Sequence, residues 1–375
     1  MASEKFEETV RSLLSSAGVT LNGSAPWDMR VNDPRTYRRI LGDGSLGLGE
    51  SYMDGWWDCE ALDVFLDRII RAKLDKFVKS NLKFVFYALQ AKFVNLQTKS
   101  RSNEVVLSHY NLDSDFFMSF LDSYNQYTCG YFKDADDLDK AQEQKLQLIC
   151  DKLNLTSKDR VLDVGCGWGG FAKFAAERYG CHVTGITISD EQIKYARNYC
   201  KGLPVEIIKS DYRDFKTIKP FDKILVCGMI EHVGYKNYKV FMKKVSELLK
   251  NDGVFLLHTI GWNFSDVKLD PWLNKYIFPN GLLPSISQIG KAVEGIFIME
   301  DWHNFGPLYD KTLLAWAERF ERAWPELKKN YDERFRRMWR YYLLSCAAAF
   351  RSRSSQLWQI VMTKVGRAQP VCRIT

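Results

Sequence analysis

The chain has 375 residues, 46% hydrophobic and 26% charged, which is typical of a globular protein and excludes collagen-like or wholly disordered chains. This length exceeds the roughly 100–200 residues of one domain, so we expect two packed units. The formal net charge is +7, and nine basic residues against one acidic residue lie between Arg68 and Arg101. The rest of the chain is therefore close to neutral, and no nucleic-acid partner is expected.

The sequence carries no recognisable targeting or spanning segment. Charged residues interrupt the apolar ones in the first 18 positions, so the apolar core of a signal peptide is missing. The longest weakly charged apolar run, 341–350, is far shorter than the roughly 20 residues that cross a bilayer. We expect a cytoplasmic protein. The nine cysteines form no CxxC pair, so we expect reduced thiols, with no zinc or other metal site.

The N-terminal part is predicted to be a small, mainly helical domain over residues 1–95, followed by a linker at 96–106. Residues 4–17 place their apolar side chains on one helical face, and a glycine-rich stretch follows at 42–65. The basic segment 68–101 mixes charged and apolar residues, as does a helix lying on an anionic lipid surface. A packed helical pair with a solvated basic face explains the same pattern equally well.

Residues 107–375 are predicted to form a doubly wound, Rossmann-like α/β domain, because apolar runs alternate with amphipathic helices. An aromatic-rich insertion is expected at about 262–308, and long helices are expected from there to about residue 350. The expected strands are 160–165, 182–188, 205–209, 223–228 and 254–261.

The first of these strands runs into a glycine turn, VLDVGCGWGG at 161–170. Glycine has no Cβ, so the backbone can approach a ligand closely. The turn matches the GxGxxG pattern of dinucleotide sites, and together with Asp163 it also matches the DxGxGxG of S-adenosylmethionine (SAM) methyltransferases. A dehydrogenase needs an acid at the tip of the second strand, where this chain has Thr187. Most methyltransferases have an acid there too, so the turn alone leaves both cofactors open.

Segments along almost the whole chain resemble the cyclopropane-fatty-acyl-phospholipid synthases of the mycolic-acid cyclopropane synthase family. In that family a GxTxS sequence replaces the acid at the second strand tip, which accounts for Thr187. This chain departs from the family at a few positions, including Thr128 in place of serine. The matching segments are GSLGLGESYMDGWW (44–57), HYNLDSDFF (109–117), QYTCGYFKDADDL (126–138), VLDVGCGWGG (161–170), GITIS (185–189), MIEHVG (229–234), LLHTIG (256–261), KYIFPNG (275–281) and EDWHNFGPLYDKTLLAW (300–316).

The resemblance implies a SAM site that uses side chains from several segments. Ser189 and Gln192 also form an S-x-x-Q capping pattern at a helix start, so Gln192 can serve the helix, the cofactor or both. The implied cofactor residues are Tyr127, Thr128, Gly165 and Gly167 for the amino-acid end, Thr187 and Gln192 for the ribose, and Asp211 and Tyr212 for the adenine.

The implied reaction moves a methyl group from SAM to a cis alkene in a phospholipid acyl chain and then closes a cyclopropane ring. Attack by the alkene leaves a carbocation, so a base must remove a proton from the added methyl group. Glu231 follows the fourth expected strand and His258 lies on the fifth, near the carboxyl ends where open α/β sheets bind ligands. The resemblance implies bicarbonate as the base, held by Cys129, Glu231, His258, the Ile260 backbone and Tyr309.

Three other functions stay open at this point. One is a SAM-dependent fatty-acid C-methyltransferase that leaves a methyl branch, and another is a nicotinamide oxidoreductase, which the missing acid disfavours. The third is a non-catalytic lipid-binding protein, against which the intact Cys129, Glu231, His258 and Tyr309 argue. The resemblance further implies a homodimer and a substrate bilayer with unsaturated acyl chains. The basic segment 68–101 predicts peripheral binding to the inner face of the membrane, with a preference for anionic lipid.

Overall fold

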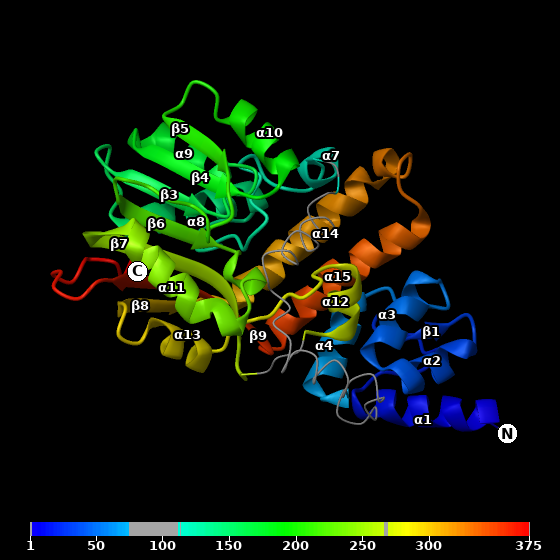
Figure 1. Cartoon of the computed structure of the whole chain (residues 1–375). Helices are drawn as coiled ribbons and strands as arrows, with labels where there is room; N and C mark the ends of the chain where they lie inside the picture. The colour runs from blue at the N-terminus through cyan, green and yellow to red at the C-terminus, as the bar shows by residue number, and fades with distance from the viewer. Residues whose placement is uncertain (1, 75–111, 113, 266–268, 375) are drawn as a thin grey trace. The chain divides into compact units, whose positions relative to one another are not determined.

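The computed structural model describes residues 2–74, 112, 114–265 and 269–374, which belong to two compact units (Figure 1). The first unit takes residues 1–95 together with 267–279 and 313–355. The second takes 96–266, 280–312 and 356–375. Most of the basic segment predicted to contact lipid, and the whole predicted linker at 96–106, lie outside the described residues.

The first unit is mainly helical, and segments distant in sequence pack together in it. Gly49 lies so close to the Trp272 ring that a Cβ on it would stand 2.4 Å from Trp272 Cδ1. Tyr341 meets the same indole with ring centroids 4.7 Å apart, and the Arg337 guanidinium lies 4.1 Å from the ring centroid of Tyr52. Its elements are α1 (Ala2–Ser16), β1 (Arg30–Val31), α2 (Arg35–Asp43), α3 (Ser45–Met53), β2 (Trp57–Asp58), α4 (Leu62–Arg71), α12 (Pro271–Tyr276), α15 (Glu333–Arg351) and most of α14 (Pro307–Leu327).

The first unit includes residue ranges beyond the contiguous N-terminal domain that was predicted over 1–95. Two later segments, 267–279 and 313–355, belong to the same unit. The physical reason is the apolar faces of α12 and α15, whose large aromatic side chains are buried against α3 and α4. The chain therefore passes between the units more than once.

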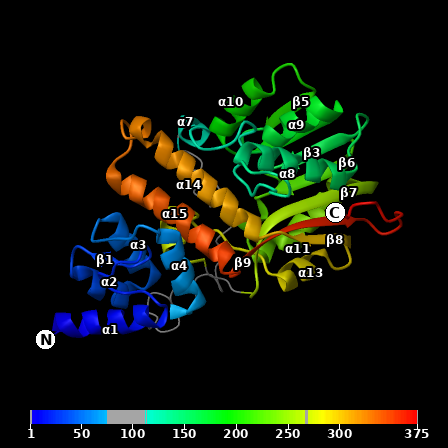
Figure 2. The ribbon, with the colours of Figure 1, turned by 180° about the vertical axis from the view of Figure 1, so that it is seen from behind.

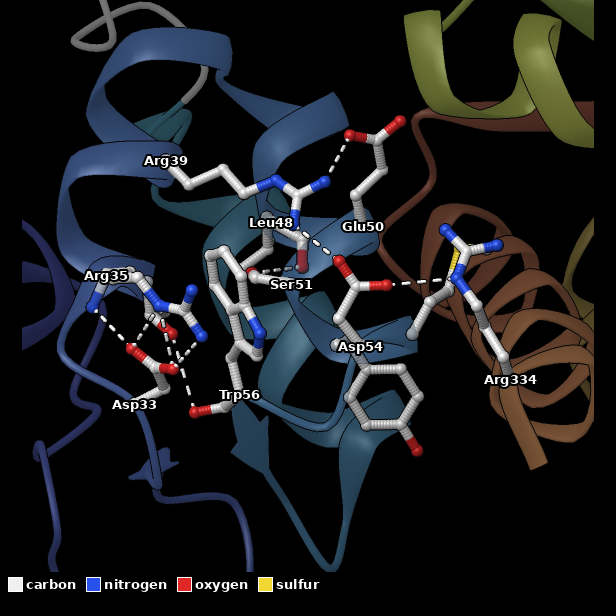
Figure 3. Close-up of polar contacts among 12 residues, drawn as sticks. Asp33, Arg35, Arg39, Leu48, Glu50, Ser51, Asp54, Trp56 and Arg334 are labelled. Carbon is white, nitrogen blue, oxygen red and sulfur yellow. Dashed lines mark hydrogen bonds and ion pairs between the residues drawn. The ribbon is translucent and has the colours of Figure 1, made fainter.

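An ion network crosses the first unit between α2, α3 and α15 (Figure 3). Arg39 reaches Glu50 with Nη2 at 2.7 Å and Asp54 with Nη1 at 2.6 Å. Asp54 also pairs with Arg334 Nε at 2.9 Å. Glu50 is buried and Asp54 is exposed, and because Glu50 has a cationic partner its charge is compensated between the helices.

The second unit is built on a seven-stranded sheet with the order β5-β4-β3-β6-β7-β9-β8. The strands from β5 to β7 are parallel, and β8 pairs antiparallel with β9. Figure 2 shows the ribbon from behind. The strands are β3 (Arg160–Val164), β4 (His182–Thr187), β5 (Val205–Lys209), β6 (Phe221–Cys227), β7 (Leu249–Trp262), β8 (Ile298–Asn304) and β9 (Ser355–Thr363).

Helices cover both faces of this sheet because alternate strand residues are apolar on each side. Val161 packs with α8 and α9, whereas its neighbour Leu162 packs with α11 and α13 on the opposite face. This confirms the predicted doubly wound α/β fold. The helices of the second unit are α7 (Ser114–Met118), α8 (Leu138–Leu153), α9 (Gly170–Tyr179), α10 (Asp190–Tyr199), the 3-10 turns η2 (Ile230–His232) and η3 (Tyr235–Asn237), α11 (Tyr238–Leu248) and α13 (Ile286–Val293).

All five predicted strands are present as β3 to β7, but the antiparallel pair β8 and β9 was not predicted. β8 falls inside the segment interpreted as an insertion at 262–308, so part of that segment belongs to the sheet. β9 is buried at every residue. Its sequence contains Gln356 and Gln359, which interrupt the apolar run that would have predicted a buried strand. Among the described helices, none has a stretch long and apolar enough to cross a bilayer.

Candidate functional site

A cavity of about 190 Å³ opens in the second unit beside the carboxyl ends of β3, β4 and β6. Its wall is formed by the turn after β3, the tip of β4, residues after β5 and the turn after β6. It contains every residue that the sequence predicted for the SAM site: Tyr127, Thr128, Gly165, Gly167, Thr187, Gln192, Asp211 and Tyr212.

The glycine turn after β3 takes a backbone conformation that favours glycine. Gly165 and Gly167 have φ of +81° and +53°, in the left-handed region. The Gly165 N–H donates to the Ile186 carbonyl at 2.9 Å, which ties the turn to the end of β4. A Cβ on Gly167 would meet nothing within 4 Å, so the space before this residue is open and a side chain would fill it. The turn therefore leaves room for a ligand against the backbone.

At the tip of β4, Thr187 and Gln192 are held against each other. The Thr187 hydroxyl donates to Gln192 Oε1 at 2.8 Å. Ser189 caps α10 by accepting from the Gln192 N–H. The Gln192 backbone thus serves the helix, while its carboxamide and the Thr187 hydroxyl lie in the cavity wall.

The residues that follow β5 bring a carboxylate and an aromatic ring to the cavity wall. Asp211 accepts from Arg213 Nε at 2.8 Å and from the Arg213 backbone N–H at 2.9 Å. Tyr212 packs edge-on against Phe241 with ring centroids 5.0 Å apart. Burial raises the pKa of Tyr212 to about 12, so this phenol is neutral at physiological pH. A carboxylate, an aromatic face and a glycine cradle together fit the polar groups and flat base of SAM.

A second group of predicted residues lies behind the turn after β6. Glu231 belongs to η2, and its Oε1 accepts from the Ile260 N–H of β7 at 2.8 Å. His258 lies two residues earlier on β7, opposite Cys227 in the sheet register. The Ile260 backbone was expected to hold bicarbonate, and in this structure its N–H donates to Glu231. Glu231, His258 and Ile260 are brought together by the pairing of β6 with β7.

Two buried polar atoms in this group have no hydrogen-bond partner among the described residues: Glu231 Oε2 and His258 Nε2. Burial raises the pKa of Glu231 above its usual range. Burial, together with the positive charges of Lys145 and Lys152, lowers the pKa of His258 well below its usual range. The group therefore presents a carboxyl that retains its proton readily and a neutral imidazole.

Cys129 and Tyr309 complete the predicted set. The Cys129 Sγ lies 3.2 Å from the Gly130 carbonyl oxygen and accepts from the Thr312 hydroxyl at 3.9 Å. Burial strongly raises its pKa, so it is a thiol and not a thiolate. Its neighbour Thr128 lies 3.7 Å from Cys227 Sγ, which connects this segment to the end of β6. Tyr309 is buried in the first turn of α14.

The sequence reasoning missed two buried lysines, Lys145 and Lys152, on the face of α8 that packs on the sheet. Lys152 pairs with Asp301 of β8 at 3.4 Å. Their spacing of seven residues places both on one helical face among apolar residues, and this pattern was the available signal. Both side chains contribute positive charge near His258.

Comparisons with known proteins support the same reading of the fold and the cavity. Residues 97–360 match the family model described as mycolic acid cyclopropane synthetase. The chain is 53% identical over 361 residues to the cyclopropane-fatty-acyl-phospholipid synthase of Escherichia coli (strain K12), a match that covers 96% of this chain and 94% of that protein. It is 36% identical over 277 residues to a probable fatty acid methyltransferase of Pseudomonas putida, covering 71% of this chain and 70% of that protein.

Among solved structures, the chain is similar to a mycolic acid cyclopropane synthase complexed with SAH and CTAB. The TM-score is 0.66 and the sequence identity 29%, with 72% of this chain and 100% of the other covered. The family model and the relative that matches nearly the full length agree with the motifs found along the sequence. This chain belongs to the mycolic acid cyclopropane synthetase family.

Proposed function

We propose that this protein is a SAM-dependent cyclopropane-fatty-acyl-phospholipid synthase, which adds a methylene bridge across a cis double bond of a phospholipid acyl chain. The observation that carries the proposal is the position of Glu231. Its neighbour His232 lines the cofactor cavity, whereas the Glu231 carboxyl turns to β7. An acid–base group thus lies one residue behind the wall of a cavity that fits SAM.

Each part of the site has a separate task in this proposal. When bound in the cavity, SAM supplies an electrophilic methyl group. Tyr127, Thr128 and the glycine turn hold its amino-acid end, while Thr187 and Gln192 hold the ribose. Asp211 and Tyr212 flank the adenine. The burial of Glu231 and His258 keeps water from competing with the alkene for the methyl group.

We propose bicarbonate as the base, bound by Cys129, Glu231, His258, the Ile260 backbone and Tyr309. Glu231 Oε2 and His258 Nε2, which have no partner in the described part of the chain, support this proposal, because a small ion with donors and acceptors could satisfy both. The positive charge of two buried lysines near His258 favours an anion. When bound, bicarbonate supplies the basic oxygen for the proton lost before ring closure. Glu231 retains its proton beside such an anion, since burial already raises its pKa.

The phospholipid substrate requires contact with a lipid surface, and we propose peripheral binding to the inner face of a membrane, with anionic lipid favoured. The support is the nine basic residues between Arg68 and Arg101. Vesicle sedimentation tests this directly: binding to anionic vesicles is expected to weaken as salt is raised. Equal binding to neutral vesicles at every salt concentration contradicts it. A homodimer is also proposed, and light scattering of the purified protein tests it.

Lipid mass spectrometry tests the main proposal. Purified protein incubated with SAM and unsaturated phospholipid vesicles is expected to yield phospholipid heavier by one methylene group. With SAM that carries a fully deuterated methyl group, a cyclopropane keeps two deuteriums, because one hydrogen has been lost to a base. A methyl branch formed without that loss keeps three. An exocyclic methylene also keeps two, so proton NMR must show the upfield ring signals, and their absence contradicts the proposal.

The related methyltransferase of Pseudomonas putida makes a fatty-acid C-methyltransferase the second candidate. The retained-deuterium count and the NMR signals separate the two candidates in one experiment. Binding of SAM with no new lipid product favours a non-catalytic lipid-binding protein instead.

A further inference from the structure

Lys145 is a fully buried lysine in α8. Its ammonium group does not line the cofactor cavity but contacts side chains that do. Its Nζ donates to the Thr128 hydroxyl at 3.0 Å and also to the Gln126 side-chain oxygen. Thr128 and Gln126 both line the cavity, whereas Lys145 itself does not. Lys145 therefore contacts the cavity wall from the side opposite to the ligand.

The segment that carries these two residues is fixed both by α8 and by Asp122, which precedes it in the chain. Gln142, one helical turn before Lys145, donates from Nε2 to the Thr128 carbonyl at 2.7 Å. Asp122 accepts from the backbone N–H groups of Tyr124 and Gln126, each at 2.8 Å. The backbone and the side chain of Thr128 are thus held separately, and Lys145 controls only the side chain.

Burying an ammonium group is costly, and the neighbouring groups offset the cost only partly. Burial lowers the pKa of Lys145, and two nearby carboxyl groups, Asp122 and Asp163, oppose this shift. Burial raises the pKa of these two carboxyls, to about 6 for Asp122 and about 7 for Asp163. An apolar side chain of similar volume would fill the same space without this cost. A role in packing alone does not account for a lysine here.

We propose that Lys145 is a positioning residue for the amino-acid end of SAM, acting through Thr128 and Gln126 and through the positive charge that it places behind the cavity wall. The inference rests on the proposed function only in taking SAM as the ligand of the cavity. A hydroxyl and a carboxamide held by an ammonium group have fixed orientations, so less entropy is lost when a ligand binds. The positive charge favours a ligand that carries a carboxylate. The adenosine end lies against other residues and gains nothing from Lys145.

Two probes of different length separate this role from a general effect on folding. S-Adenosylhomocysteine carries the whole amino-acid portion, whereas 5′-methylthioadenosine keeps the adenosine and sulfur but lacks that portion. Titration calorimetry on Lys145→Met is expected to show an affinity for S-adenosylhomocysteine that is about 10- to 100-fold weaker, the range for loss of charge-assisted hydrogen bonds. The affinity for methylthioadenosine is expected to change less than about threefold. Lys145→Gln keeps a hydrogen-bond donor, so its affinity for S-adenosylhomocysteine is expected to lie between those of the wild type and Lys145→Met.

Lys152→Met is the matched control, because it removes a second buried lysine from the same helix whose ionic partner, Asp301, does not line the cavity. It is expected to leave the ratio of the two affinities unchanged. Equal weakening of both probes in Lys145→Met, or an unchanged affinity for S-adenosylhomocysteine, overturns the inference. If Lys145→Met does not fold, the ratio measured on Lys145→Gln decides in the same way. A wild-type protein that binds both probes but alters no phospholipid contradicts the proposed function and leaves this inference standing.

Discussion

Two glutamates, Glu50 in the first unit and Glu231 in the second, are almost equally buried, with 8% and 7% of their surface exposed. Glu50 Oε2 accepts from Arg39, as Figure 3 shows, and its Oε1 accepts from Lys275 Nζ at 2.5 Å and from the Tyr276 hydroxyl at 2.8 Å. Glu231 Oε1 accepts from the Ile260 N–H, and Oε2 has no hydrogen-bond partner within the geometric limits among the described residues. Exposure alone does not distinguish the two side chains.

The surroundings of Glu50 and Glu231 shift their pKa values in opposite directions. Burial raises the pKa of Glu50, but the hydrogen bonds from Lys275, Tyr276 and Arg39 outweigh burial and lower it to about 2. At Glu231 burial dominates, and the pKa is raised. A carboxylate whose two oxygens both accept from cationic side chains stabilises the fold and can do little chemistry. A carboxyl with an unused oxygen and a raised pKa is suited to exchange or hold a proton.

The largest expected effect is on turnover in Glu231→Gln. The substitution keeps the shape of the side chain but leaves a group that cannot ionise or pass a proton to the bound base, so we expect cyclopropane formation to fall roughly 100-fold or more, as for loss of acid–base groups. Binding of S-adenosylhomocysteine, measured by calorimetry, is expected to stay unchanged because Glu231 does not line the cavity. The exposed Glu247 on α11 gives the control Glu247→Gln. An active Glu231→Gln enzyme would contradict the role proposed for this residue.

The two glutamates also illustrate which features of the fold and the site could be predicted from the sequence. Strand ends and the glycine turn follow from local patterns, so the five parallel strands could be predicted, whereas the other residues around the cavity were implied by the family resemblance. Pairing between distant segments could not: the bond from Ile260 to Glu231, the partners of Glu50 in α12 and the antiparallel β9 all depend on tertiary contacts. The buried lysines of α8 were missed because a lysine is normally exposed.

A smaller effect is expected on stability in Glu50→Gln. The substitution removes the charge that Arg39 and Lys275 share, and hydrogen bonds to charged groups contribute about 1.5–3 kcal/mol. We expect the free energy of unfolding, measured with urea, to fall by about 1–3 kcal/mol, with turnover per folded molecule unchanged. Glu60→Gln, at an exposed site of the same unit, is the control and is expected to change little. A Glu50→Gln protein as stable as the wild type would show that the network contributes nothing.

The smallest expected effect is a difference in how pH changes the two variants. The folded pKa of Glu50, about 2, lies below the ordinary value of 4.5, so its stabilisation is complete above about pH 4.5 and is lost as pH falls toward 2. The deficit of Glu50→Gln should therefore shrink in acid. The folded pKa of Glu231 lies above 4.5, so the folded state holds this proton more tightly than the unfolded state, and ionisation favours unfolding as pH rises above 4.5.

Glu231→Gln should accordingly gain stability over the wild type as pH rises, which is the opposite trend. Thermal unfolding of the wild type and both variants between pH 3 and pH 8 measures the two differences, and the carboxyls of Asp122 and Asp163 contribute equally to each protein and cancel. A deficit of Glu50→Gln that grows in acid, or a Glu231→Gln protein that loses stability relative to the wild type as pH rises, would break the comparison. Opposite slopes would show that two carboxyls with similar exposed surface differ in proton affinity, because Glu50 has cationic partners whereas burial dominates at Glu231.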